Sequence, residues 1–253
     1  MTYVSRPLEM LIGVVKKAGV GLVRDFSELE QLQSAVKGHY EFTQAAIERT
    51  GSILRNELNK LRPDMPVISS GDKLPDEECF VINPLDGSAN FMHSIPYFAI
   101  SLTHLKRGEA IYAVIYNPAT GDTYFAEKGA GGFKEGNRNH LRTRVSARSD
   151  LKKAIVSVSN QCSVKTADAQ TRTFGAISLD LANVAAGKFD GMVVENAKLA
   201  EVCAGIALLK ESGGWVYAVG KEGGRTSIQD LLRSGNSFVA GNEVIGKKLF
   251  ELV

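Results

Sequence analysis

The start of the chain carries apolar residues at helical spacing. Leu8, Leu11, Ile12 and Val15 fall at i, i+3, i+4 and i+7, which places them on one face of an amphipathic helix. A second helix is predicted to end at Pro63, and its apolar positions are Ile47, Leu54, Leu58 and Leu61. The chain is therefore expected to open with two helices.

The pattern changes to that of strands at residues 79–82. Three further runs rich in β-branched and aromatic residues follow at 97–105, 110–117 and 123–129. Gly, Pro and Asp separate these runs, as they commonly do between antiparallel strands. The middle of the chain therefore predicts an antiparallel meander.

Helix and strand patterns alternate in the remainder. Strands are expected at 154–159, 189–194, 215–219 and 237–241, and helices at 177–187, 199–214 and 243–253. The order predicts a layered α+β/αβ architecture in which two sheets pack between helices. We expect residues 1–253 to fold as one unit, with helices and meander in 1–150 and the alternating part in 151–253.

Composition excludes several classes of protein. The 253 residues are 44% hydrophobic and 23% charged, and 30 Lys and Arg against 28 Asp and Glu give a net charge of +2. This balance argues against a nucleic-acid-binding surface and a disordered tail. Cys79, Cys162 and Cys203 are odd in number and lack metal-binding spacing, and no segment resembles a leader or a membrane span. A reduced, cytoplasmic protein is expected.

The stretch NPLDGSAN at 83–90 is the strongest candidate for chemistry. It places the oxygen-bearing side chains of Asn83 and Asp86 three residues apart on what we predict to be a tight turn after a strand. Pro84 stiffens the turn, and Gly87 lets the backbone approach a ligand closely. The following N–H groups could cradle phosphate, and Mg²⁺ prefers such oxygen ligands. An ordinary Asp-Gly turn is the alternative on these residues alone.

The surroundings of this stretch favour a loop that binds phosphate and Mg²⁺ over an ordinary Asp-Gly turn. NPLDGSANFMHSIPYFAIS resembles the D-P-[IL]-D-G-T-T-N-F…P-x-F-A-V-S signature of the inositol monophosphatase family. YNPATGDTYFAEKGAGGF, GAISLDLANVAAGKFDG and AEVCAGIALLKESGG resemble three further blocks of that family, in the same order and at similar spacing. The resemblance covers nearly the whole chain and is strongest to the bacterial SuhB-like branch. It implies a layered α-β-α-β-α sandwich.

The resemblance also implies an active site. Active members use Mg²⁺ ions held by carboxylates to activate water and to stabilise the leaving group in phosphate monoester hydrolysis. Their metal-binding positions fall on Ser70, Asn83, Leu85 (through its carbonyl), Asp86 and Glu201. Their catalytic positions include Asp86 and Ser88, and an acidic residue that orients water falls on Ile47. Their phosphate- and substrate-binding positions fall on Gly87, Ser88, Ala89, Gly175, Ala176 and Ile177.

Several of these positions depart from the family pattern. Ser70 supplies no carboxylate, Asn83 is neutral, and Glu201 is one methylene longer than the expected aspartate. We therefore expect Mg²⁺ binding to be weak or absent. Phosphatase activity is expected to be weak or lost and replaced by a binding or regulatory role.

Alternatives remain open at this point. An active Mg²⁺-dependent inositol-1-phosphate phosphatase could use Asp72 as a surrogate for Ser70, and a metal-free scaffold could bind another anion or small molecule. The family's sugar-binding acid falls on Val194, with Glu195 next to it. Val194 is more simply read as a core strand residue.

The expected partners follow from the same resemblance. They are a small phosphorylated sugar or inositol if the protein is active, a protein of the transcription machinery, and a second copy in a homodimer. No membrane association is expected.

Overall fold

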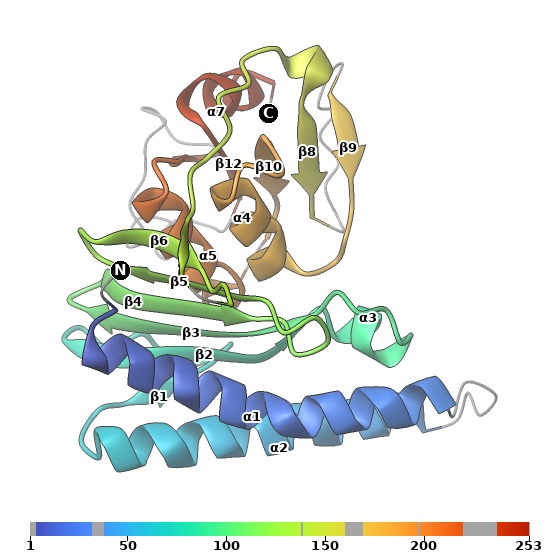
Figure 1. The fold of residues 1–253 in the computed structure, drawn as a ribbon, viewed down its shortest axis with the longest axis vertical. Coiled ribbons are helices and arrows are strands. Elements are labelled where there is room, and N and C mark those ends of the chain that lie inside the picture. The colour runs from blue at the N-terminus through green and yellow to red at the C-terminus, as the bar shows by residue number, and fades with distance from the viewer. Residues whose placement is uncertain are drawn as a thin grey trace.

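Five alternating layers of helix and sheet make up the molecule (Figure 1). The computed structural model describes residues 4–31, 38–137, 139–159, 169–196, 198–219 and 237–252. Cys162 lies outside these residues. The order of the layers is α1 and α2, a first sheet, α4 and α5, a second sheet, and α7. The predicted α-β-α-β-α sandwich is confirmed.

The described residues form six α-helices. Their bounds are α1 Arg6–Gln31, α2 His39–Leu61, α3 Ser88–Met92, α4 Ile177–Ala185, α5 Leu199–Glu211 and α7 Glu243–Phe250, and a 3₁₀ turn, η1, covers Leu151–Lys153. Among the described residues, no helix is both long enough and apolar enough to cross a bilayer.

The described strands form two sheets. The first sheet has seven strands in sequence order: β1 Val67–Ile68, β2 Glu78–Asp86, β3 Ala99–Lys106, β4 Glu109–Tyr116, β5 Thr123–Glu127, β6 Gly131–Lys134 and β7 Leu141–Arg142. Only β1 and β2 are parallel here, so the predicted meander is present. The second sheet has the order β11-β12-β10-β8-β9, from β8 Ile155–Val158, β9 Gln170–Arg172, β10 Gly191–Val194, β11 Trp215–Ala218 and β12 Phe238–Gly241.

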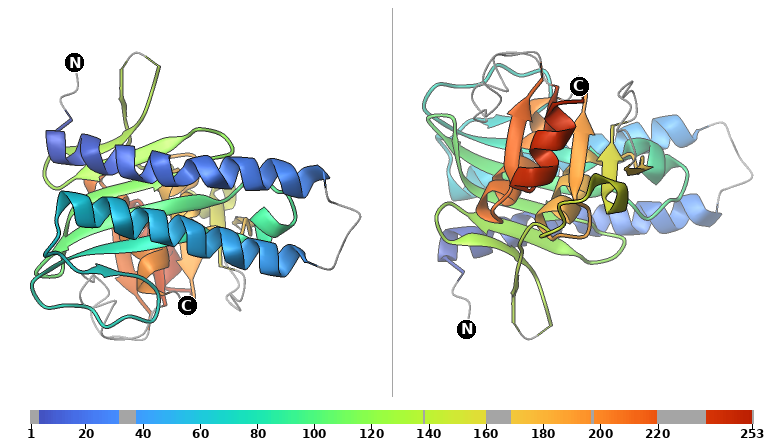
Figure 2. Two further views of the ribbon diagram at one scale, coloured as in Figure 1. Left: turned by 90° about the horizontal axis from the view of Figure 1, so that it is seen from below. Right: turned by 90° about the horizontal axis from the view of Figure 1, so that it is seen from above.

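The first two helices lie antiparallel across one face of the first sheet (Figure 2). Their apolar faces are those expected from the spacing, since Leu8, Leu54 and Leu58 are almost completely buried. A buried carboxylate also joins the pair, because Asp25 accepts a hydrogen bond of 2.6 Å from Arg49 on the other helix.

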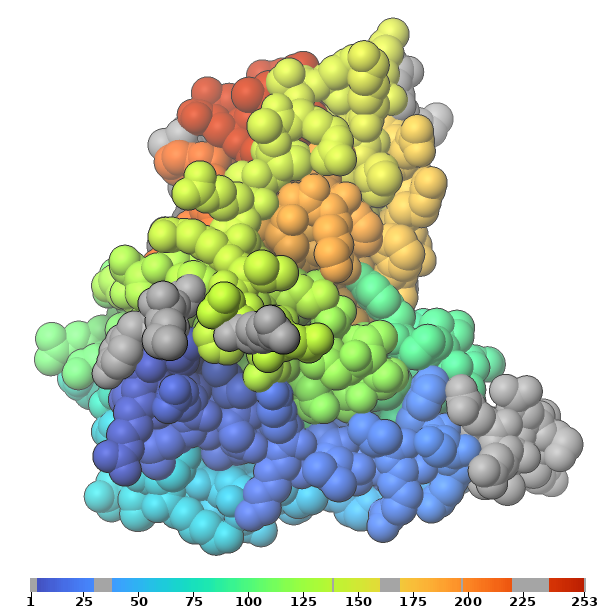
Figure 3. Space-filling model, viewed as in Figure 1, coloured from blue at the N-terminus to red at the C-terminus, as the bar shows by residue number. Residues whose placement is uncertain are grey.

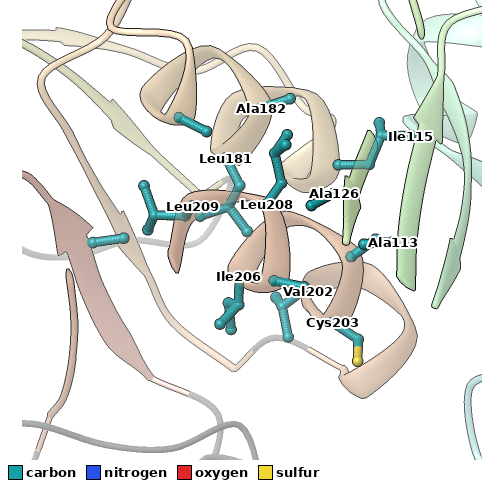
Figure 4. Close-up of a cluster of buried hydrophobic side chains, with 14 of the residues drawn as sticks. Ala113, Ile115, Ala126, Leu181, Ala182, Val202, Cys203, Ile206, Leu208 and Leu209 are labelled. Carbon is teal, nitrogen blue, oxygen red and sulfur yellow. The ribbon is translucent and has the colours of Figure 1, made fainter. Parts of the chain in front are cut away.

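The central layer contains the largest cluster of buried hydrophobic side chains in the described chain. Helices α4 and α5 lie between the two sheets, and their side chains interdigitate (Figure 4). Leu181 of α4 and Leu208 of α5 are buried in this cluster. Gly205 allows the close approach, because a Cβ atom there would lie 2.5 Å from Cβ of Leu181. The thiols of Cys79 and Cys203 are free and buried, the latter in this layer.

Some local expectations were wrong. Residues 83–86 continue strand β2 and do not form a tight turn, and the short helix α3 follows them. The terminal helix ends at Phe250 and does not reach residue 253 within the described chain. Neither α3 nor the short strands β1, β7 and β9 is long enough to show a hydrophobic period, so the pattern of apolar residues could not predict them.

The packing of α5 gives a test of the central layer. Gly205→Ala places a methyl group against Leu181, and overpacking of this kind costs about 1–3 kcal/mol of unfolding free energy. Gly13→Ala is the matched control, because Gly13 is also helical but has no atom within 4 Å of the added carbon. Alanine favours helix there by about 0.5–1 kcal/mol. Urea denaturation should therefore show opposite signs, and equal effects would contradict this packing.

Candidate functional site

A bulge at the end of β2 positions the candidate site. Asn83 pairs with Ser101 of β3 and Asp86 pairs with Ala99, so three residue steps on β2 face two on β3. Pro84 lies inside this irregular segment, and it has no N–H to offer to the sheet. Bulges redirect side chains and are common beside functional sites. Here the bulge lies directly before Asp86.

Gly87 then brings three segments together. It has φ of 77° and precedes α3. A Cβ atom at this position would lie 2.9 Å from the carbonyl oxygen of Tyr97 and 3.0 Å from Cβ of Ala176. Both the left-handed conformation and the close approach therefore require glycine. Asn90 secures the same junction by donating hydrogen bonds of 2.7 Å to the carbonyl oxygens of Tyr97 and Phe174.

Asp86 contacts the first turn of α4. Its Oδ2 atom accepts hydrogen bonds from the backbone N–H of Ser178 at 2.6 Å and from the Ser178 hydroxyl at 2.5 Å. The Asp86 carboxylate therefore satisfies one of the N–H groups that the start of a helix leaves without an intrahelical acceptor. This contact links β2 of the first sheet to the helix layer beneath the second sheet.

Burial controls the charge of Asp86. Desolvation raises its pKa to about 7, against the lowering effect of the two Ser178 hydrogen bonds, and the carboxylates of Glu201 and Asp180 add to the rise. Near neutral pH the protonated form of Asp86 is therefore well populated. No cation compensates this carboxylate in the described chain.

Asp180 forms a second buried carboxyl one turn along α4. Its two oxygens accept hydrogen bonds from the Tyr97 hydroxyl at 2.6 Å and from the Ser157 hydroxyl at 2.5 Å. Asn183 donates in turn to the Tyr97 hydroxyl at 3.0 Å. Burial raises the pKa of Asp180 to about 6, although both hydroxyl hydrogen bonds oppose this.

These groups surround a cavity of about 310 Å³, called the Asp86 cavity below. The surface of the segment after β2 adjoins that of α4 in the space-filling view (Figure 3). Ten of the residues singled out from the sequence line it: Asn83, Leu85, Asp86, Gly87, Ser88, Ala89, Gly175, Ala176, Ile177 and Glu201. The assignment of catalytic, metal-binding and substrate-binding roles to them stays a prediction.

Ser70 and its suggested surrogate do not reach the lining. Ser70 is exposed in a turn in which Asp72 N–H donates to the carbonyl oxygen of Ser69. The Asp72 carboxylate accepts a hydrogen bond of 2.8 Å from Ser69 N–H and lies 4.0 Å from Arg55. Ile47 is also outside the lining and packs in the helix layer of the first sheet. The structure therefore does not bring these three positions to Asp86.

Residues around β10 and α5 complete the lining. Val194 is buried in β10, as its interpretation as a core residue predicted, whereas Glu195 lines the cavity. Glu201 turns one carboxylate oxygen back to its own helix, where it accepts from Lys198 N–H at 3.0 Å. This contact is half of a capping box.

Sequence reasoning missed Asp180 and Ser178 as members of the site. Both follow the Gly175–Ile177 block directly, and position 180 lies about one turn of helix after Ile177. The available signal was therefore the placement of an aspartate in the first turn of the predicted helix.

The donor set does not fit a two-metal centre. Asn83 is neutral, and Ser70 is absent from the lining. Both oxygens of Asp180 accept protein hydrogen bonds, and Asp86 and Glu201 each have one oxygen engaged in this way. Among the described residues, no three His, Cys, Asp or Glu side chains gather closely enough to hold a metal ion. Mg²⁺ requires near-octahedral oxygen coordination and dehydrates reluctantly. This arrangement does not support a catalytic step through Mg²⁺.

Comparison with known proteins gives a consistent result over the whole length. A model of the inositol monophosphatase family matches residues 5–253. The chain is 35% identical to an inositol-1-monophosphatase of Rhizobium meliloti, with 98% of this chain and 96% of the relative covered. It is 27% identical to a Nus factor SuhB of Xylella fastidiosa, with 97% and 94% covered. The crystal structure of extragenic suppressor protein SuhB from Bartonella henselae is similar with a TM-score of 0.83, at 32% identity and 99% coverage of both chains.

The raised pKa of Asp86 predicts that replacing its carboxyl group with a neutral one stabilises the protein, by an amount that depends on pH. Between pH 4 and 7 the unfolded carboxyl is ionised while the folded one keeps its proton, so stability falls as pH rises to about 7. Asp86→Asn removes this loss. With a chelator present, its unfolding free energy should exceed that of the parent by up to about 4 kcal/mol at pH 8 and by little at pH 4.

Asp190 provides the matched control for this measurement. It is as buried as Asp86, but it accepts hydrogen bonds from the Arg148 guanidinium at 2.9 Å and from Ile155 N–H at 2.8 Å. Asp190→Asn should therefore destabilise the protein at pH 8, because it removes the charge that faces Arg148. Denaturant titration of both variants measures the difference. A loss of stability in Asp86→Asn at pH 8 would contradict the assigned electrostatics.

Proposed function

The chain belongs to the inositol monophosphatase family, and on that premise we propose that its metal-assisted hydrolysis of phosphate monoesters is weak or lost and that the Asp86 cavity serves to bind a small polyhydroxylated molecule. The observation that carries this proposal is the donor set of the cavity. Family members are generally Mg²⁺-dependent, and the described lining lacks the Ser70 position and has a neutral Asn83.

The charge of the lining supports a neutral ligand. Four acidic side chains, Asp86, Asp180, Glu195 and Glu201, line the cavity, and no described Lys, Arg or His does. Carboxyl groups and the Asn83 amide are good hydrogen-bond partners for hydroxyl groups. A phosphate dianion would instead be repelled by these carboxylates unless a cation accompanied it. An inositol or sugar ring matches the lining better than the phosphorylated form does.

An active phosphatase is the second candidate, and the 35% identical relative named inositol-1-monophosphatase favours it. For this candidate to hold, the turn at 69–72 would have to rearrange so that Asp72 left Ser69 N–H and entered the cavity. The Mg²⁺ would then be held by Asp86, Asn83, Glu201 and the rearranged segment.

Turnover separates the two candidates. We expect inositol-1-phosphate hydrolysis in Mg²⁺ to be about 10²-fold slower than that of the Rhizobium meliloti relative assayed alongside, because misplaced reacting groups cost about this much. Phosphate release measures the rate. Turnover equal to that of the relative, and abolished by Asp86→Ala but not by Asp72→Ala, would overturn the proposed loss of activity. Equal turnover that both variants abolish would also overturn the proposed loss of activity, and it would identify Asp72 as the surrogate.

Calorimetry tests the preference for a neutral ligand. Without divalent cations at pH 8, myo-inositol should bind about tenfold more tightly than inositol-1-phosphate, as expected for one unfavourable charge interaction of about 1.4 kcal/mol. The difference should shrink at pH 5.5, where Asp86 and Asp180 are largely protonated. Tighter binding of inositol-1-phosphate than of myo-inositol at pH 8 would show that the Asp86 cavity is not the ligand site.

Two expectations about partners stay predictions. The 27% identical relative named Nus factor SuhB supports a protein partner in the transcription machinery. A homodimer and a cytoplasmic location are likewise proposed from the family resemblance alone.

A further inference from the structure

A second cavity lies at the opposite end of β2 from Asp86. It has a volume of about 570 Å³ and lies between the start of α1, the end of α2 and the first sheet. We call it the basal cavity. Figure 1 shows the start of α1 on one side of the molecule and α3, which follows Asp86, on the other. The basal cavity is therefore separate from the site proposed above.

The walls of the basal cavity are mainly apolar and aromatic. They include Met10, Leu11, Leu61, Phe80, Ile111 and Tyr112. His104 lies between two of the rings, with centroids 5.2 Å from Phe80 and 5.7 Å from Tyr112. Ligand cavities typically combine such walls with a few polar groups, and their volumes run from about 300 to 1,000 Å³. Size and lining both suit a flat, small organic molecule.

The polar groups of the basal cavity carry an excess of positive charge. Arg6, Arg62 and Lys106 line it together with the single carboxylate of Glu78. Glu78 is already satisfied, because its Oε1 atom lies 2.7 Å from Nε2 of His104 and its Oε2 atom lies 3.5 Å from Arg62. No described carboxylate lies within ion-pair distance of Arg6 or Lys106.

The protonation states of His104 and Glu78 keep this excess in place at neutral pH. Burial lowers the pKa of His104, although its contact with Glu78 opposes the change. Burial also disfavours the ionised form of Glu78, but the hydrogen bond and the charge of His104, together with the charges of Arg62 and Lys106, outweigh it and lower the pKa of Glu78. With His104 neutral and Glu78 ionised, three cations face one anion.

From this geometry we propose that the basal cavity binds a small organic anion with a flat apolar body, such as an aromatic carboxylate. The ring would stack against the wall formed by Phe80, His104 and Tyr112. The carboxylate would face Arg6 and Lys106 at the rim, where it compensates charges that the described chain leaves without an acidic partner. Arg62 holds Glu78 and keeps that carboxylate away from the ligand.

Titration calorimetry with 2-naphthoate, a flat aromatic carboxylate, tests the proposal. We expect one saturable site per chain, and binding of the uncharged 2-naphthamide about three- to fivefold weaker, in line with one partly exposed charge interaction. Arg6→Gln combined with Lys106→Gln should weaken naphthoate binding about three- to tenfold and leave naphthamide unchanged. Absence of saturable binding at about 5 mM naphthoate would overturn the proposal, because a millimolar site would be detected.

A matched pair of tryptophan variants locates the bound naphthoate. Met10 lines the basal cavity and is 43% exposed, so Met10→Trp should fill the mouth without disturbing the core and weaken binding at least about tenfold. Val20 is 70% exposed on the same helix and lies outside the lining, so Val20→Trp should bind as the parent does. Equal binding by both would place naphthoate elsewhere and overturn the proposal.

Asp86→Asn separates this proposal from the proposed function. Because Asp86 lies in the other cavity, this variant should retain naphthoate binding whatever happens to binding of inositol. Loss of naphthoate binding in Asp86→Asn would mean that naphthoate occupies the Asp86 cavity. This result would overturn the proposal for the basal cavity and leave the proposed function unaffected.

Discussion

The arrangement of the candidate site depends on the contact between Asp86 and Ser178. Two short hydrogen bonds fix the end of β2 to the first turn of α4. The absence of a side chain at Gly87 allows its segment to approach Tyr97 and Ala176 this closely. The two halves of the sandwich therefore meet at a charged group that is costly to bury, and the cavity forms around it.

That cost also explains the chemistry we assign to the cavity. In a metal centre, buried carboxylates are compensated by cations. Here hydroxyl and backbone donors compensate only part of the cost of burial, so the pKa values of Asp86 and Asp180 stay raised. A site stabilised in this way suits the hydroxyl groups of a ligand better than its phosphate. The family resemblance and the local electrostatics thus give different information, the first about the fold and the second about what the fold can still do.

The fold and most of the lining were predictable from sequence because they depend on local patterns. Apolar spacing predicted α1 and α2, and the Gly175–Ile177 block predicted one wall of the cavity. The bulge before Asp86 depends on the register with β3, and the environment of Asp180 depends on Tyr97, which is 83 residues away. The turn that holds Asp72 against Ser69 is local, but a family resemblance assigns positions and not side-chain directions, so this contact could not be predicted either.

Strand β2 connects two regions of opposite charge. Glu78, at its start, borders the basal cavity with its excess of cations, and Asp86, at its end, borders the acid-lined cavity. A strand rises about 3.3 Å per residue, so nine residues separate these regions by roughly 25 Å. This exceeds twice the Debye length of about 8–10 Å at physiological salt. The molecule therefore has an uneven charge distribution despite its small net charge of +2. The basal cavity and the Asp86 cavity attract solutes of opposite sign, and the charges of each are screened from the other.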